Sequence, residues 1–442
     1  MVRTAIISLL ALVLALGVAL SAARPALAGA GPYVITGSKA GPIDIPSAKV
    51  STGKTIAALS LPEGGWFVTA KAVLVGAGPV GSNHGPGCAL IVGSVARADE
   101  VFATPAGDGR DGSRVPILLT TAGRLSSPGK AKLRCVLEVD SPGQTRIRDI
   151  RITALRAGTL TTWEGVTVAK TTGTGSPQVI SLRMTSSESV TIAGDGADHH
   201  VGRLDLPAGR WWVVAKAVAV NSGGVSDDVS CRLDVGGDFD DQRFHLSLPS
   251  AGTLMPLALQ AVHAFDSPGS VVLHCRGSIG FTIVVVTITA VEAGRLTNVA
   301  LGGGLTWSKG AGLPRVISGW SNGPIPVAPG STWTTVATLN LRAGRWTILG
   351  KLFFEAESVP PSAERRRLIC RLAWAGAQDR SEVVYADNVT RVAPLVLSVA
   401  GQSSSAGSAV LQCRRTTAGG TGAVWFVKMT ALKAGSLVEL GG

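Results

Sequence analysis

The sequence predicts an all-β protein made of three tandem β-sandwich domains. Three observations lead to this prediction: one short motif occurs three times, apolar residues around it alternate with a period of two, and each copy is followed by two cysteines. A unit that recurs at domain-length spacing indicates one domain type used three times. Alternation with a period of two is the pattern of a strand that buries one face.

The motif is a short turn that ends in tryptophan. It reads Leu-Pro-Glu-Gly-Gly-Trp at 61–66, Leu-Pro-Ala-Gly-Arg-Trp at 206–211 and Leu-Arg-Ala-Gly-Arg-Trp at 341–346. A Pro-x-Val-Ile segment precedes each copy, and a Thr-Ala-hydrophobic-x-Ala-Gly-x-Leu segment closes it. These limits predict repeats at 31–160, 176–297 and 313–438, joined by Gly- and Thr-rich linkers at 161–175 and 298–312.

Each repeat reads as a series of short strands. After the motif of the second repeat, Trp211, Val213 and Ala215 share one face, and Trp212 and Val214 share the other. β-branched residues are enriched in such segments, and clusters of Gly, Pro, Asn and Asp separate them. No segment after the leader shows a helical period. Many short strands with regular turn signals predict a two-sheet sandwich or a jelly roll.

All six cysteines lie in the repeats, two in each copy. Because the spacing within a copy is nearly constant, the repetition selects pairing within each copy. A zinc site would need closely spaced Cys or His pairs, which the sequence lacks. The predicted disulfides are Cys88–Cys135, Cys231–Cys275 and Cys370–Cys413.

Residues 1–28 have the features of a secretory signal peptide. Arg3 precedes a long apolar run, and Ala26-Leu27-Ala28 is a small-x-small site that predicts cleavage before Gly29. An uncleaved anchor helix is the alternative interpretation. The rest of the chain has no second apolar run of spanning length, so a secreted, extracellular protein is expected. The formal net charge of +12 favours anionic partners. Nucleic acid is not indicated, because no basic run alternates with aromatic residues.

The order of these segments resembles a known class of exported protein. The Pro-x-Val-Ile opening, the Pro-Ala-Gly-x-Trp turn, a Cys-Arg-Leu strand, a Ser-Pro-Gly-x-Val-x-Leu-x-Cys strand and the Thr-Ala-Leu-x-Ala-Gly close are similar to exported jelly-roll repeats of high-GC Gram-positive bacteria. Those repeats in turn resemble the tumour-necrosis-factor and complement globular-head class. The resemblance covers nearly all of the chain after the leader. The cysteine pair in each copy departs from that class.

The resemblance has implications for architecture. It implies a jelly-roll sandwich for each repeat, with an immunoglobulin-like sandwich as the alternative. Members of the class often form trimers about a three-fold axis, so three joined copies imply an intrachain pseudo-trimer. The competing arrangement is a string of separate domains.

Two sequence matches to enzyme motifs are better explained as loops. Gly319-Trp320-Ser321-Asn322-Gly323 fits the hydrolase G-x-S-x-G pattern, but Pro324 and Pro326 follow where that elbow needs a helix. The Gly-rich segment at 76–81 is likewise not followed by a helix pattern, so no phosphate site is predicted there. No catalytic residue, cofactor site or metal site is predicted.

A lysine follows the motif tryptophan at the same distance in every repeat. These residues are Lys71, Lys216 and Lys351. One interpretation is that the lysine stem covers apolar surface while the ammonium stays in water. The other is that this face packs between repeats or meets an acidic partner. The acids Asp238, Asp240 and Asp241 are interpreted as a solvated turn.

The third repeat concentrates arginine and tryptophan near its two cysteines. Guanidinium groups recognise carboxylate and phosphate in a bidentate way, and an exposed indole can stack on the ring of a sugar. The alternative is a solvated basic loop with core tryptophans. The candidate ligand-binding residues are Arg365, Arg366, Arg367, Arg371, Arg414, Arg415 and Trp374.

These observations favour a secreted, non-enzymatic binding protein of the cell envelope or extracellular space. Acidic glycans or wall polymers are the expected partners. An architectural surface or appendage module without a soluble ligand is the first alternative. An exported hydrolase is the second, because a catalytic triad assembled from distant residues leaves no sequence motif.

Overall fold

The structure is a computed structural model. All the residues that it describes belong to one compact unit, Gly31–Gly442. The described ranges are 32–45, 53–76, 86–93, 98–102, 113–137, 145–164, 167–172, 175–184, 188–221, 227–246, 254–301, 305–358, 366–385, 392–416 and 421–440. These residues form strands and turns without helix, as predicted. None of them forms a helix that could cross a membrane. The predicted signal peptide at 1–28 lies outside these ranges.

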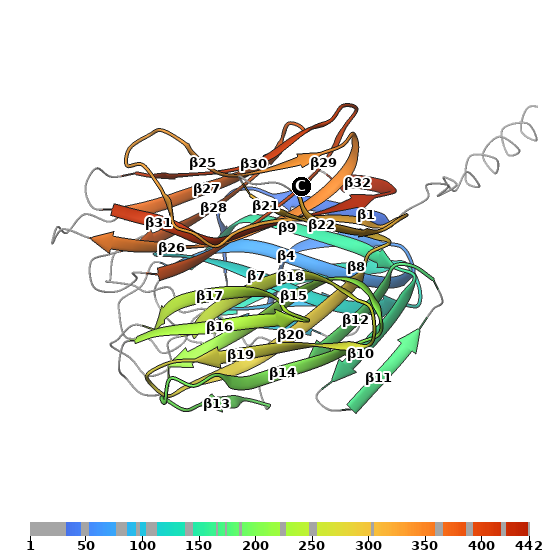
Figure 1. The fold of residues 1–442 in the computed structure, drawn as a ribbon, viewed down its shortest axis with the longest axis horizontal. Helices are drawn as coiled ribbons and strands as arrows, with labels where there is room; N and C mark the ends of the chain where they lie inside the picture. The colour runs from blue at the N-terminus through green and yellow to red at the C-terminus, as the bar shows by residue number, and fades with distance from the viewer. Residues whose placement is uncertain are drawn as a thin grey trace, which may run out of the picture. The chain divides into compact units, whose positions relative to one another are not determined.

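The second repeat shows the plan that all three repeats follow. One sheet holds the motif strand and has the order β11-β10-β12-β20-β15-β18, with β13 also on β20. The other holds both cysteines and has the order β14-β19-β16-β17, which Figure 1 shows in green and yellow. We call these the motif sheet and the cysteine sheet. The motif-sheet strands are β10 (Thr159–Glu164), β11 (Thr167–Thr172), β12 (Gln178–Arg183), β13 (Val190–Ile192), β15 (Gly209–Asn221), β18 (Leu254–Phe265) and β20 (Phe281–Glu292). The cysteine-sheet strands are β14 (His199–Leu206), β16 (Asp227–Val235), β17 (Asp238–Leu246) and β19 (Gly269–Arg276).

The first and third repeats have the same two sheets. In the first repeat the orders are β32-β1-β9-β4-β7, with β2 on β9, and β3-β8-β5-β6. Its strands are β1 (Tyr33–Lys39), β2 (Ile43–Asp44), β3 (Lys54–Leu61), β4 (Gly64–Gly76), β5 (Pro86–Val92), β6 (Ala98–Phe102), β7 (Ser113–Leu125), β8 (Gly129–Leu137) and β9 (Arg146–Ala157). In the third repeat the orders are β22-β21-β23-β31-β26-β29, with β24 on β31, and β25-β30-β27-β28. Its strands are β21 (Arg295–Ala300), β22 (Leu305–Gly310), β23 (Arg315–Ser321), β24 (Ile325–Pro326), β25 (Thr334–Leu341), β26 (Gly344–Ser358), β27 (Arg366–Trp374), β28 (Ala377–Tyr385), β29 (Val392–Ser403), β30 (Gly407–Arg415), β31 (Thr421–Ala434) and β32 (Ser436–Leu440).

Strand order identifies the sandwich type. In the second repeat the principal strands in chain order are β12, β14, β15, β16, β17, β18, β19 and β20. The first and eighth are neighbours in the motif sheet, and the second and seventh are neighbours in the cysteine sheet. This nesting of outer strand pairs around inner ones is a jelly roll made of two Greek keys. The immunoglobulin-like alternative is wrong, because its first and second strands share a sheet.

The predicted linkers are strands. Segment 161–175 contributes to β10 and β11, and segment 298–312 contributes to β21 and β22. The strand β10 pairs in parallel with β12, and β21 pairs in parallel with β23, so the chain closing one repeat enters the motif sheet of the next. The sequence predicts no strand in these Gly- and Thr-rich segments, but Thr is β-branched and suits a strand. In the same way β32 pairs in parallel with β1 of the first repeat (Figure 1).

The motif has a structural explanation. Trp66, Trp211 and Trp346 are almost fully buried in the cores of their repeats. Each indole N–H donates to the main-chain oxygen four residues earlier, at 3.0, 3.1 and 2.9 Å. The turn between them contains a glycine with φ of 136°, 154° or 140°, a region that residues with a Cβ rarely adopt. The turn therefore supplies the hydrogen-bond acceptor that a buried indole needs.

The disulfides join Cys88 to Cys135, Cys231 to Cys275 and Cys370 to Cys413, as predicted. Each pair lies directly opposite on neighbouring strands of the cysteine sheet. Their side chains point into the core shared by the two sheets of the repeat.

We expect loss of one disulfide to weaken its repeat substantially. Replacing Cys231 and Cys275 together with Ala removes a cross-link that constrains the unfolded chain, and should lower the free energy of unfolding by about 2–5 kcal/mol. Urea unfolding of the purified chain measures this. The matched pair Cys370→Ala/Cys413→Ala should behave similarly because it occupies the equivalent site. Unchanged stability in both variants would contradict the prediction.

Candidate functional site

All three recurring lysines are buried, and two of them contact a neighbouring repeat. Lys71, Lys216 and Lys351 are each at most 1% exposed. Lys71 Nζ in the first repeat lies 3.0 Å from Asp379 Oδ1 in the third. Lys351 Nζ in the third repeat lies 2.8 Å from Asp240 Oδ1 in the second, and donates to the Asp241 main-chain oxygen at 2.6 Å. The interpretation as stems that reach water is wrong, and packing between repeats is correct.

The two aspartates are held in the same way. Asp240 Oδ2 accepts the main-chain N–H of Gln260 at 2.8 Å, and Asp379 Oδ2 accepts that of Ser398 at 2.8 Å. Each carboxylate therefore contacts its own repeat with one oxygen and the neighbour's lysine with the other. Asp240 is fully buried, so its interpretation as part of a solvated turn is wrong. A buried charge is stable only where an opposite charge and additional hydrogen bonds meet it, and each aspartate has both.

Asp240 has a second cationic neighbour. Lys428 Nζ lies 3.9 Å from Asp240 Oδ1 and donates to the Phe239 main-chain oxygen. Burial lowers the pKa of both Lys351 and Lys428, while the attraction of Asp240 opposes that shift. The charge of Lys351 lowers the pKa of Lys428 further. The Asp240 carboxylate is thus the counter-charge of two buried ammonium groups.

Apolar side chains from all three repeats surround these charges. They lie on the face of each motif sheet that points away from its own core, and we call them the inter-repeat cluster. Its members include Phe67, Leu118, Trp212, Val214, Leu349 and Val396. The rings of Phe67 and Trp212 meet edge to face with centroids 6.2 Å apart. Each motif sheet is therefore buried on both faces.

One polar side chain links the second and third repeats within this cluster. Gln260 Nε2 donates to the main-chain oxygens of Leu349 and Lys428, at 3.2 and 3.3 Å. Its Oε1 accepts the Trp212 indole N–H at 3.3 Å. At the first–third contact, Arg114 forms an ion pair with Glu382, and the Arg151 guanidinium donates to the Gln378 main-chain oxygen at 3.4 Å.

The predicted ligand-binding residues of the third repeat separate into buried and accessible groups. Trp374 is 3% exposed and donates its indole N–H to the Gly401 main-chain oxygen at 3.3 Å. Arg415 is also 3% exposed and donates to the Val327 main-chain oxygen at 2.9 Å. Neither side chain can contact a ligand from these positions, which corrects the prediction for both. The reason is strand parity: Trp374 shares the inward face with Cys370, and Arg415 shares it with Cys413.

The arginines upstream of Cys370 are only partly described. Arg365 lies outside the described residues, and Arg366 begins β27 with a side chain that is also outside them. Arg367 is half-buried, with its guanidinium 3.8 Å from Glu382 Oε1. These residues do not form a described cluster with Arg371 and Arg414.

Arg371 and Arg414 instead meet at Trp333. Their Cζ atoms lie 4.3 and 4.8 Å from the Trp333 ring centroid. Gln412 accepts from Arg371 Nε at 2.9 Å and donates to Thr335 Oγ1 at 3.2 Å. We call Trp333, Arg371, Gln412 and Arg414 the Trp333 platform. Cation–π contact fixes the planar guanidinium groups on the outer face of the cysteine sheet, where all of these side chains are half-buried.

The Trp333 residue was not among the predicted site residues. It lies just before β25, at the end of the strand that neighbours β30. Parity places Arg371 and Arg414 on the outer face, but only the register of β25 with β30 brings Trp333 beside them. The sequence signal was therefore present for the arginines and absent for the indole.

The two enzyme-like motifs do not gain support. Ser321 ends β23 and is followed by β24, so strand and turn occupy the place where a nucleophile elbow needs a helix. Residues 77–81 of the Gly-rich segment lie outside the described ranges. Within those ranges, no group of three or more His, Cys, Asp or Glu side chains is placed to hold a metal ion.

Comparisons with known proteins give weak similarities. No family model and no curated protein matches the sequence. A structure described as the triple jelly-roll fold and turret assembly of an archaeal virus is 8% identical over 92% of both chains, with a TM-score of 0.18. Recombinant peptide:N-glycanase F is 9% identical over 57% of this chain and 97% of its own, with a TM-score of 0.26. The VP2 subviral particle of infectious bursal disease virus is 10% identical over 89% and 84%, with a TM-score of 0.20. At such TM-scores these similarities support no functional argument.

The ion pair between the second and third repeats should be essential for stability. We expect Asp240→Asn to lower the free energy of unfolding by about 3–5 kcal/mol, because two buried ammonium groups lose their counter-charge. Adding Lys351→Met should recover part of that loss. Chemical denaturation measures both variants.

A matched exposed pair provides the control for Asp240→Asn. Arg203 and Asp205 are 2.8 Å apart, but their side chains are 57% and 70% exposed. Asp205→Asn should therefore leave stability almost unchanged. An equal loss in the Asp205 and Asp240 variants would show that the buried pair is not special.

Stability should depend on pH through Lys351 and Lys428. Their pKa values lie below the ordinary 10.5, so the unfolded chain binds more protons than the folded one. Their contribution to the free energy of unfolding therefore rises with pH, from the lowered folded pKa up to 10.5. Compared with the parent, Lys428→Met should flatten this rise in urea titrations, whereas Lys309→Met at an exposed position should not. Parallel curves for the parent and Lys428→Met would contradict the shift.

Proposed function

We propose that the protein is an exported, non-enzymatic binding module in which the three repeats close into an intrachain pseudo-trimer. The strongest support is that equivalent lysine–aspartate pairs connect successive repeats in the same direction. The lysine of the first repeat pairs with an aspartate of the third, and the lysine of the third repeat pairs with the equivalent aspartate of the second. Parallel pairing of β32 with β1 adds a third junction to those made by β10 and β21.

The cyclic pattern also indicates the counter-ion of Lys216. Asp240 lies opposite Leu233 and Asp379 lies opposite Leu372 in the cysteine sheets. The backbone of Asp99 lies opposite Leu90, which is the equivalent place in the first repeat. By strand position, Asp99 is thus equivalent to Asp240 and Asp379, although its side chain lies outside the described residues. A string of separate domains would have no use for a buried lysine at this position in every repeat.

Export is supported by the disulfides and by the predicted leader. Disulfides persist in oxidising compartments, and each repeat contains one. We place the protein at the cell envelope or in the extracellular space. The motif order resembles the tumour-necrosis-factor-like class, and we propose that this single chain reproduces the three-fold assembly that members of that class often form.

Recognition is assigned to the outer faces of the cysteine sheets, and these faces differ. The third repeat presents the Trp333 platform, whose guanidinium groups are held in place by stacking. The first presents Lys130, Lys132 and Arg134 along β8. Fixed guanidinium groups beside an indole suit the carboxylate or phosphate groups of an acidic glycan or wall polymer. An architectural role with no soluble ligand is the alternative, and self-assembly of the purified chain would favour it.

Retention on cell-wall material tests the binding assignment. Arg371→Ser combined with Arg414→Ser should reduce retention severalfold, because it removes both fixed cations. The triple variant Arg365→Ser/Arg366→Ser/Arg367→Ser should reduce it as well if the adjoining segment contributes. Arg203→Ser, on the second repeat, is the control. Full retention by the Arg371/Arg414 variant, with unchanged melting temperature, would remove the Trp333 platform from the account.

A further inference from the structure

We propose that the cysteine sheet of the second repeat contains a binding pocket for a tetrahedral oxyanion, a phosphate or sulfate group. The pocket is lined by Ser230, Arg243 and Arg276, together with Gly196, Gly277 and Ser278. We call it the oxyanion pocket. It belongs to a different repeat from the Trp333 platform and shares no residue with it.

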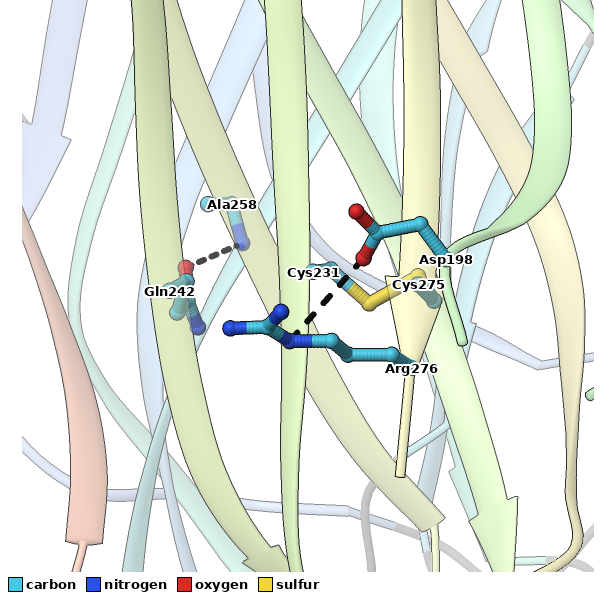
Figure 2. The surroundings of a disulfide bond; sticks show 6 residues. All are labelled: Asp198, Cys231, Gln242, Ala258, Cys275 and Arg276. Atoms are coloured by element: carbon cyan, nitrogen blue, oxygen red, sulfur yellow. Dashed lines mark hydrogen bonds and ion pairs between the residues drawn. A yellow bond between two sulfur atoms is a disulfide. The ribbon is translucent and has the colours of Figure 1, made fainter. Parts of the chain in front are cut away.

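Strand register brings the two arginines to one place. Ser230 in β16 lies directly opposite Arg243 in β17 and directly opposite Arg276 in β19. Neighbouring strands are about 5 Å apart, so the two arginine backbones are about 10 Å apart with Ser230 between them. Residues opposite one another point to the same face of a sheet. Figure 2 shows Arg276 extending across β16 toward the strand that carries Gln242, the residue before Arg243.

Two described acidic side chains on this face, Asp241 and Asp234, have other partners. Asp241 accepts two hydrogen bonds from Arg232, at 2.8 and 3.1 Å. Asp234 Oδ2 lies 3.6 Å from His274 Nε2. Arg243 forms no ion pair with any of the described side chains, and its own side chain is exposed. The described side chains that line the pocket therefore include two cations and no acid.

Asp198 provides the only described restraint on Arg276. Its Oδ1 lies 3.9 Å from Arg276 Nε, which is too long for a hydrogen bond (Figure 2). Both side chains of that pair are about half exposed, at 48% and 54%. A ligand oxyanion can therefore compete for Arg276 without breaking a buried contact.

The chemistry of the lining selects the ligand. Two guanidinium groups offer paired N–H donors that match the oxygens of phosphate or sulfate, and a serine hydroxyl offers a third donor. The equivalent places in the third repeat hold Ile369 and Glu382 beside Arg414. In the first repeat the central place is Gly87. The pair of arginines around a serine is thus specific to the second repeat.

Titration with inorganic phosphate and sulfate, followed by calorimetry, tests the oxyanion pocket. The full chain should bind the ion saturably at a site that depends on Arg243 and Arg276. Arg243→Gln and Arg276→Gln should each weaken binding severalfold, and together by at least tenfold. Asp198→Asn should strengthen it severalfold, because it removes the acid that competes for Arg276. Arg203→Gln, on the adjacent strand β14, should leave the affinity unchanged.

A parallel titration with poly(glycerol phosphate) distinguishes a free ion from a phosphate group on a polymer. Binding of the polymer that is lost in the double variant supports the pocket even where the free ion binds weakly. Absence of saturable binding of all three probes to the parent chain would overturn the proposal. Equal affinity in parent and double variant would overturn it too.

The same variants separate this proposal from the proposed function. Arg371→Ser/Arg414→Ser should keep phosphate binding while it loses wall retention. Phosphate binding that follows the Arg371/Arg414 pair instead of the Arg243/Arg276 pair would place the anion elsewhere and refute the pocket. Because all four arginines are at least partly accessible, near-ultraviolet circular dichroism should confirm that these variants fold.

Discussion

Each motif sheet is buried on both of its faces, and this double burial determines how the three repeats pack. One face carries the motif tryptophan and packs on the cysteine sheet of its own repeat. The other face contributes to the inter-repeat cluster. A repeat alone would expose residues such as Trp212 and Leu349 to water, together with a lysine whose partner is in another repeat. The fold of one repeat is therefore completed by its neighbours.

Charge makes this packing selective. Apolar contact tolerates small shifts between surfaces, whereas a buried ammonium group is stable only where a carboxylate and main-chain oxygens meet it. Lys351 meets Asp240 and the Asp241 main-chain oxygen at one relative position of the second and third repeats. The parallel pairs β10–β12, β21–β23 and β32–β1 also fix which repeat lies beside which. We infer that the ion pairs specify the arrangement and that the apolar cluster supplies most of its stabilisation.

Much of the fold could be predicted from the sequence, because the same signals occur in all three repeats and support one another. Three copies of the motif, six cysteines at nearly constant spacing and alternating apolar residues predicted the all-β class and the three disulfides. The strands within 161–175 and 298–312 were not predicted, because Thr-rich segments have the composition of a loop when their parallel partners, β12 and β23, are not known. Trp374 and Arg415 could have been assigned to the core by counting parity from the adjacent cysteines. Asp240 could not have been recognised as buried, since its acidic neighbours suggested solvent and its partner is Lys351 of another repeat.

Small-angle X-ray scattering of the purified chain in solution tests whether the three repeats close on one another. If they do, the chain should form a single compact particle, with one symmetric peak in the distribution of interatomic distances and no dependence on protein concentration. An elongated particle, with a distribution that has separate maxima for successive domains, would contradict it.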